Sequence, residues 1–176
     1  MTAPLIVTPP PTGHIRIRFV TDDTDPLAFL IRLDTMAKVS HTEAVLRDGS
    51  IIGAYGQGVV RNAINFDKTS SAQMFVDIPR TAEQINAWEL FLMTKIGTPY
   101  DYAAVAGFAL HANMHTPGHV ICSALMTDAL RHNGVVSEKQ FKPDHMTSPG
   151  DLAMALSFMA KMCDFTVTSL EYRVLL

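Results

Sequence analysis

The chain has 176 residues, of which 48% are hydrophobic and 18% are charged, and its formal net charge is −3. This length and composition are typical of one globular domain with a substantial core, and they exclude extensive disorder. Lys and Arg are scattered along the chain, so the sequence lacks the clustered positive charge that nucleic-acid binding usually needs. We therefore expect no nucleic-acid partner.

The first residues, MTAPLIVTPPPTG, predict a flexible proline-rich lead over residues 1–13, followed by a single domain over residues 14–176. The lead has no basic segment and no apolar stretch before its prolines, so it does not resemble a signal peptide. No window reaches the roughly 18 uninterrupted apolar residues of a membrane span. We expect a cytoplasmic protein without a transmembrane segment, and its oligomeric state stays open.

The first half of the domain predicts strands and one short helix. Apolar and basic residues alternate over residues 14–20, which is typical of a strand, and apolar positions at helical spacing predict a helix over residues 27–36. Two apolar runs flank an Asp-Gly pair at 48–49, which predicts a β-hairpin with arms near residues 41–47 and 50–54.

The second half predicts mainly helices. The sequence predicts a strand over residues 72–79, then a capping box formed by Thr81 and Gln84, and then a helix that closes at Gly97. A helix containing Cys122 runs to Gly134, another capped helix lies within residues 145–162, and the last residues predict a strand. The sum is an α+β fold, with a small antiparallel sheet or half-barrel packed against helices.

Cys122 raises the question of whether it serves packing or chemistry. It shares a helical face with Leu125, Met126 and Ala129, which favours a buried small hydrophobe. A thiol in the first turn of a helix also meets unpaired backbone N–H groups, which lower its pKa toward a reactive thiolate. Cys163, late in the last helix, has no base in its neighbourhood, and we expect it in the core.

His41 is the histidine best placed to act as a base. It opens a strand of the hairpin, and the period of two in a strand puts His41 and Glu43 on one face. A carboxylate beside a histidine can hold the tautomer that a base requires. An exposed polar strand end explains the same spacing equally well.

A second group of histidines suggests an alternative metal site. His111, His115 and His119 recur at a spacing of four, but Pro117 and Gly118 argue against a helix there. A solvated histidine-rich loop explains them better, and we expect neither a metal nor another cofactor.

Four blocks of the sequence resemble a known family. They are SHTEAVLRDGSIIGAYGQGVV, GTPYDY, HVICSALMTDALRHNG and TSPGDL, which together span roughly residues 40 to 150. Their order and spacing are similar to those of the circularly permuted, YiiX-like branch of the papain-like NlpC/P60 cysteine hydrolases, in which the histidine strand precedes the cysteine helix. His41 before Cys122 is the permuted order.

The resemblance implies a papain-like fold with Cys122 as nucleophile and His41 as general base, and backbone N–H groups near the helix start as an oxyanion hole. The reaction would be hydrolysis or acyl transfer at an amide, ester or thioester. The substrate would be a peptide, a peptidoglycan-like compound or another acyl compound. Tyr100 and Asp101 would lie near the cleft as substrate-contacting or structural residues.

Two departures from the family pattern bear on the site. Gly53 stands where members often carry a glutamate, so the third residue is open, with Glu43 as first choice and Gln57 as second. Ala124 stands where the helix motif commonly has a glutamate or another polar residue. The missing glutamate favours an alternative: an inactive binding or structural protein on the same fold, of the kind found in phage and prophage genomes.

Overall fold

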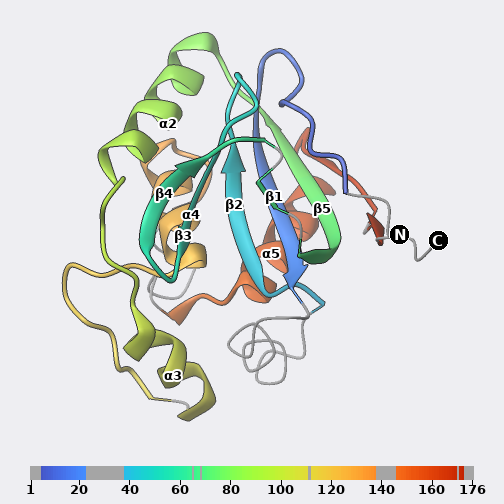
Figure 1. Ribbon diagram of the computed structural model, residues 1–176. Coiled ribbons are helices and arrows are strands. Elements are labelled where there is room, and N and C mark those ends of the chain that lie inside the picture. Colours follow the sequence, from blue (N-terminus) through green and yellow to red (C-terminus); the bar gives the residue numbers. More distant parts are fainter. Residues whose placement is uncertain are drawn as a thin grey trace.

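The structure, a computed structural model, describes residues 5–22, 38–64, 66, 67, 69–110, 112–137, 146–169, 171 and 172. The described strands are β1 (His14–Asp22), β2 (His41–Val45), β3 (Ile51–Tyr55), β4 (Gly58–Asn62), β5 (Ser70–Pro79), β6 (Thr166–Val167) and β7 (Glu171–Tyr172). The described helices are α2 (Ala82–Thr94), α3 (Tyr102–Leu110), α4 (Cys122–His132) and α5 (Pro149–Ala160). Figure 1 shows how they are arranged.

The strands form one open antiparallel sheet of seven strands in the order β4-β3-β2-β1-β5-β6, and β7 also pairs with β5. The ladder between β2 and β3 is short, with Ala44 opposite Ile52 and Val45 opposite Ile51. The ladder between β3 and β4 is longer and reaches Tyr55 opposite Gly58. The first residues of β2 therefore have β1 on one side and no β3 partner on the other.

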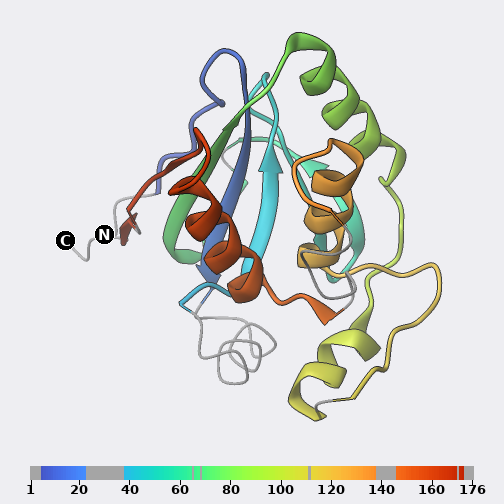
Figure 2. The same cartoon turned by 180° about the vertical axis from the view of Figure 1, so that it is seen from behind.

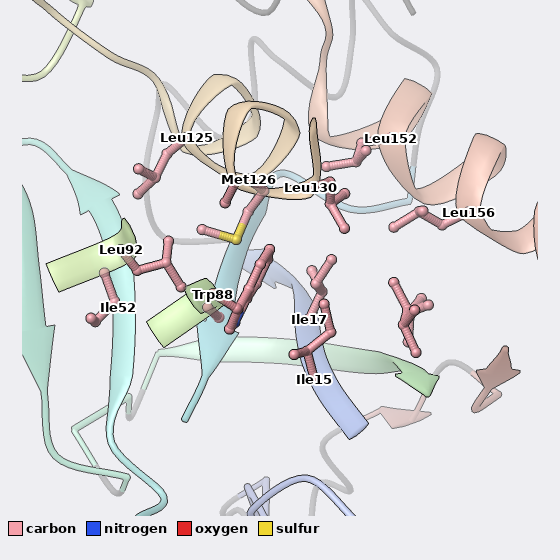
Figure 3. Close-up of a cluster of buried hydrophobic side chains, with 14 of the residues drawn as sticks. Ile15, Ile17, Ile52, Trp88, Leu92, Leu125, Met126, Leu130, Leu152 and Leu156 are labelled. Atoms are coloured by element: carbon pink, nitrogen blue, oxygen red, sulfur yellow. The ribbon is translucent and has the colours of Figure 1, made fainter. Parts of the chain in front are cut away.

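Helices α2, α4 and α5 cover one face of the sheet (Figure 2). Ile17 of β1 belongs to the same buried cluster as Trp88 of α2, Leu125 and Met126 of α4, and Leu156 of α5 (Figure 3). Burying such side chains contributes about 1.5–3 kcal/mol each, so this cluster fixes α4 against β2 and β3. Helix α3 lies away from the sheet (Figure 1).

The opposite face of the sheet is also covered. Val45, Ile51 and Phe75 are buried there, and Val7 and Phe66 pack against them. Because side chains alternate along a strand, the odd-numbered residues of β2, His41 and Glu43 among them, point to this face.

The segment before β1 is held to the sheet by hydrogen bonds. Arg16 Nη1 donates to the carbonyl oxygen of Thr8 at 2.8 Å and to that of Pro9 at 3.1 Å. Gln73 Nε2 donates to the carbonyl oxygen of Ile6 at 2.9 Å. The described part of the proline-rich lead thus lies against the domain, and the division of the chain at residue 13 stays a prediction.

The local signals for helix ends act as the sequence predicted. Thr81 and Gln84 form a capping box at the start of α2, and Ser148 and Asp151 form another at the start of α5. Each box satisfies backbone N–H groups that a helix start leaves unpaired. Gly134 has a φ of 68° just beyond α4, a conformation that favours glycine.

The predicted α+β class, the first strand, the hairpin around Asp48, the strand before α2 and the helices α2, α4 and α5 are confirmed. Strand β4 was not predicted, although Gly58, with a φ of 104°, marks the turn that leads into it. Helix α3 was not predicted either, because its sequence YAAVAGFAL has no polar face to give a period. The helix expected at residues 27–36 lies outside the described residues.

Two expectations for the C-terminal region need correction. Cys163 is exposed, so its predicted place in the core is wrong. Helix α5 ends at Ala160, and Cys163 lies in the turn beyond it, off the buried face. The single closing strand is instead two short ones, β6 and β7.

No helix in the described ranges has both the length and the apolarity that a membrane crossing requires.

Candidate active site

Cys122 is the first residue of α4, and its side chain is buried. Ile121 before it is extended and supplies no capping side chain, so the first N–H groups of the helix are left to other acceptors. The backbone N–H groups of Ser123 and of Thr42 in β2 both contact the Cys122 sulfur. Thr42 reaches the sulfur at the place where β3 no longer pairs with β2. These dipoles favour a thiolate.

His41, the first residue of β2, forms a hydrogen bond with Cys122. Burial disfavours the charged form of each group, lowering the pKa of His41 and raising that of Cys122, but their mutual attraction outweighs it. The pKa of the Cys122 thiol falls below its ordinary value. The pKa of His41 rises from 6.5 to about 10, with Glu43 adding to the effect of Cys122. These opposite shifts favour a thiolate–imidazolium pair over the neutral pair.

Glu43 lies beside His41 on the same face of β2. Its Oε2 atom is 3.5 Å from His41 Nε2, which is within ion-pair distance. Nε2 has no hydrogen-bond partner among the described residues, so its interaction with Glu43 is electrostatic. The hydrogen bond with Cys122 is therefore assigned to Nδ1.

Two further side chains hold the Glu43 carboxylate. Arg18 Nη1 donates to Oε1 at 2.7 Å, and the Tyr55 hydroxyl donates to Oε2 at 2.5 Å. Burial works to raise the pKa of Glu43, but the contact with His41, the charge of Arg18 and the Tyr55 hydrogen bond lower it below its ordinary value. The carboxylate is therefore ionised at neutral pH and its orientation is fixed at both oxygens.

Arg18 is the centre of a buried polar network on this face. Its side chain is only 1% exposed. Besides Glu43, it donates to Gln73 Oε1 at 2.9 Å and pairs with Asp67 at 2.8 Å. A buried guanidinium needs such partners, because removing a charge from water is costly. The network therefore fixes the position of the Glu43 carboxylate beside His41.

Sequence reasoning missed Arg18, Tyr55, Asp67 and Gln73. The alternation of β1 did place Arg18 on one face, but a basic residue in a strand suggests a solvated face. The pairing of Arg18 with Glu43 across β1 and β2 follows only from the register, which the sequence does not show.

The other predicted site residues lie elsewhere. Tyr100 forms an isolated parallel bridge with Val120, shortly before α4. Asp101 is buried and accepts hydrogen bonds from the N–H groups of Ala104 and Thr116, both at 3.0 Å. Tyr100 and Asp101 thus shape the segment that leads into α4. Gln57, the second choice for the third residue, is exposed in the turn between β3 and β4.

The histidines considered as a metal site do not form a common cluster in the described residues. His111 lies outside them. His115 Nδ1 is 2.6 Å from Asp101 Oδ2, and His119 Nδ1 is 3.3 Å from the carbonyl oxygen of Pro117. Within the described ranges, no group of three His, Cys, Asp or Glu side chains could hold a metal ion.

A cavity of about 600 Å³ opens beside α4, between the end of α2 and the loop that holds His115 and His119. Ala124 and Leu125 line it, whereas Cys122 and His41 do not. The cavity therefore adjoins the Cys122 helix without being the place where thiol and imidazole meet.

Comparison with known proteins bears on the fold. No protein-family model matches the chain, and no curated protein matches it. Among solved structures, it is similar to the metalloprotein yiiX (DUF1105) from Escherichia coli O157:H7, with 16% sequence identity and a TM-score of 0.58 over 94% of this chain and 99% of that one. The chain has a YiiX-like fold. The YiiX-like fold that the sequence blocks implied is thus confirmed.

Proposed function

We propose that the protein is a papain-like cysteine hydrolase or acyltransferase that acts on an amide, ester or thioester. The observation that carries the proposal is the buried pair of Cys122 and His41, in which the pKa of the thiol is lowered and that of the imidazole is raised to about 10. A thiolate is the nucleophilic form of cysteine, and an imidazolium beside it can protonate a leaving group.

The first half of the reaction forms an acyl-enzyme. The Cys122 thiolate adds to the carbonyl carbon of the substrate, and the carbonyl oxygen becomes an oxyanion. Backbone N–H groups in the first turn of α4, which have no partner inside the helix, are the donors available to it. His41 gives its proton to the leaving nitrogen, oxygen or sulfur as that bond breaks. The acyl group stays on Cys122 as a thioester, and His41 is neutral.

The second half releases the acyl group. His41, now a base, takes a proton from water or another acceptor as that nucleophile attacks the thioester. The carbon–sulfur bond breaks, and the thiolate–imidazolium pair is restored. Ionised Glu43 stabilises the imidazolium in both halves, because its Oε2 lies 3.5 Å from Nε2.

The metal implied by the description of yiiX does not fit the described residues of this chain. They contain no cluster of three side chains able to ligate an ion, and the carboxylate of Glu43 is already held by Arg18 and Tyr55. No step of the proposed reaction is therefore assigned to a metal.

The experiment that tests the proposal is alkylation of Cys122 by iodoacetamide across a pH series, measured by mass spectrometry. Cys163 is exposed and serves as an internal control in the same molecule. Cys122 should react well below the pKa of about 8.5 of a free thiol, and His41→Ala should slow the reaction at pH 6–7 by about tenfold or more. Thioester, ester and peptide substrates would follow, with intact-mass detection of the acyl-enzyme.

An inert Cys122, or a reaction that follows the pH dependence of Cys163 in both proteins, would contradict the proposal. The protein would then be studied as a binding or structural module on this fold. If Cys122 is activated but no acyl compound is turned over, Cys122 would still be assigned as a nucleophile. Only the substrate classes tested would be excluded.

A further inference from the structure

Tyr55 occupies the place where the family pattern has a glutamate side chain. Gly53 and Tyr55 lie two residues apart on β3, so both face the same side of the sheet as His41 and Glu43. A Cβ atom built on Gly53 would lie 3.0 Å from the Cε2, Cζ and OH atoms of Tyr55. The Tyr55 ring therefore folds back over Gly53 and fills the space that a side chain at position 53 would take.

The ring of Tyr55 contacts His41, and its hydroxyl contacts Glu43. Its ring centroid is 4.8 Å from that of His41, with the planes inclined by 34°. Its hydroxyl donates to Glu43 Oε2 at 2.5 Å, the same oxygen that lies 3.5 Å from His41 Nε2. Phe66 packs edge to face against the Tyr55 ring, with the two ring centroids 5.6 Å apart, which limits the movement of the Tyr55 ring.

We propose that Tyr55 is a positioning residue for the His41–Glu43 pair, and that Gly53 is required because it leaves room for the Tyr55 ring. The inference rests on the proposed function, in which His41 and Glu43 serve Cys122. The Tyr55 hydroxyl fixes the carboxylate plane and shares Oε2 with His41, while its ring holds the imidazole in one orientation. The missing glutamate is thus replaced by Glu43 together with the tyrosine that holds it.

Because Tyr55 and His41 both interact with Glu43 Oε2, the direction in which Tyr55→Phe shifts the pKa of His41 can be predicted. The Tyr55 hydroxyl and the His41 imidazolium both interact with the negative charge of Oε2, the first through a hydrogen bond and the second electrostatically across 3.5 Å, so removing the hydroxyl strengthens the interaction with His41. Tyr55→Phe keeps the ring and removes the hydroxyl, while Arg18 still holds the carboxylate in its ionised form. The charge of Oε2 then acts mainly on His41, and the imidazolium form of His41 gains stability.

The experiment is an NMR titration of the His41 ring protons in full-length Cys122→Ala protein, with and without Tyr55→Phe. The Cys122→Ala background removes the thiolate, so His41 titrates against Glu43 alone, and its signal is assigned by its loss in a His41→Gln variant. We expect Tyr55→Phe to raise the pKa of His41 by about half a pH unit or more. An unchanged or lowered pKa would overturn the proposal.

Tyr102→Phe is the matched control. Tyr102 donates its hydroxyl to the carbonyl oxygen of Gly56 at 2.9 Å, in the turn that follows Tyr55, so the same chemical change is made next to the site. It should leave the titration of His41 unchanged. An equal shift in both variants would mean that any perturbation of this turn moves His41, and the specific role of Tyr55 would be lost.

A double-mutant cycle tests the role of Gly53. Gly53→Ala should slow alkylation of Cys122 several-fold when Tyr55 is present, and should have little effect in a Tyr55→Leu background, since leucine lacks the atoms that the new Cβ would meet. Equal slowing in both backgrounds would overturn this part. Thermal melts check that each variant is folded, and if Gly53→Ala does not fold, the His41 titration decides alone.

Failure of the proposal for Tyr55 can be distinguished from failure of the proposed function. If Cys122 of the wild-type protein proves inert, the proposed function falls, while the titration in the Cys122→Ala background still reports whether Tyr55 controls His41. If Cys122 is activated and Tyr55→Phe leaves His41 unchanged, only the role of Tyr55 is lost.

Discussion

Strands β1 and β2 contribute alternate side chains to two faces of the sheet, and the faces are held together by different interactions. Toward the helices, Ile17 lies in one apolar cluster with Trp88 and Leu125. Toward the other face, Arg18 meets Glu43 in a buried ion pair. Apolar packing depends mainly on volume, whereas a buried ion pair depends on the position of each donor and acceptor.

This difference between the two faces bears on the location of the candidate active site. Cys122 belongs to the apolar cluster on the helical face of the sheet. It nevertheless contacts His41, which lies on the face that carries the polar network. The two residues meet near the start of β2, where β3 no longer pairs with β2. The helix supplies a buried thiol, and the opposite face supplies charges that lower the pKa of that thiol. Neither face alone provides both.

The largest expected effect is on the free energy of unfolding. It is measured by comparing substitutions of similar size on the two faces of the sheet. Arg18→Met leaves the Glu43 and Asp67 carboxylates without their buried partner, so we expect a loss of about 3–5 kcal/mol in the free energy of unfolding. Leu125→Met keeps the volume of a core residue and should cost less than about 1.5 kcal/mol. Urea denaturation of both variants measures the difference. Similar losses would contradict the distinction between the faces.

The next effect concerns the proposed catalysis and its pH dependence. The thiolate exists above the lowered pKa of Cys122, and the imidazolium persists until pH rises through about 10, so the ion pair spans the interval between them. Glu43→Gln removes the negative charge beside His41, and the upper limit should fall by about one pH unit or more. At fixed neutral pH, we expect a loss of turnover on the order of 10²-fold.

The control for Glu43→Gln is Glu89→Gln on α2, where the carboxylate pairs with exposed Arg47 instead. That substitution should leave the pH profile of Cys122 alkylation unchanged. A profile that is the same for wild type and Glu43→Gln would mean that Glu43 serves the stability of the network and not the imidazole.

The sequence permitted the apolar part of the fold to be predicted because periodicity and capping are local. The capping box at Thr81 and the turn at Gly49 are each specified within a few residues. The Cys122 helix and the His41 strand were predicted in the same way, and the family resemblance indicated that they meet. Glu43 was placed beside His41 by alternation alone.

The polar network was not predictable because its members come from distant parts of the chain. Arg18, Asp67 and Gln73 meet only through the β1–β5 and β1–β2 registers and the loop before β5. Gly53 suggested a missing catalytic group, whereas the structure shows that the Tyr55 ring occupies its place. A gap in a motif therefore says little until the neighbours of that position are known.

The smallest expected effect tests whether the helices on one face of the sheet can be destabilised without changing the reactivity of Cys122. Ser148→Ala removes the side-chain half of the capping box of α5 and should lower the free energy of unfolding by about 1 kcal/mol. Since α5 meets α4 through apolar contacts and not through His41 or Glu43, the alkylation rate of Cys122 should stay within twofold of wild type. Thr81→Ala at the start of α2 is a matched variant with the same expectation. A slower reaction in either would show that the position of the Cys122 thiolate depends on how firmly the helices hold α4, and not only on the polar face that ionises it.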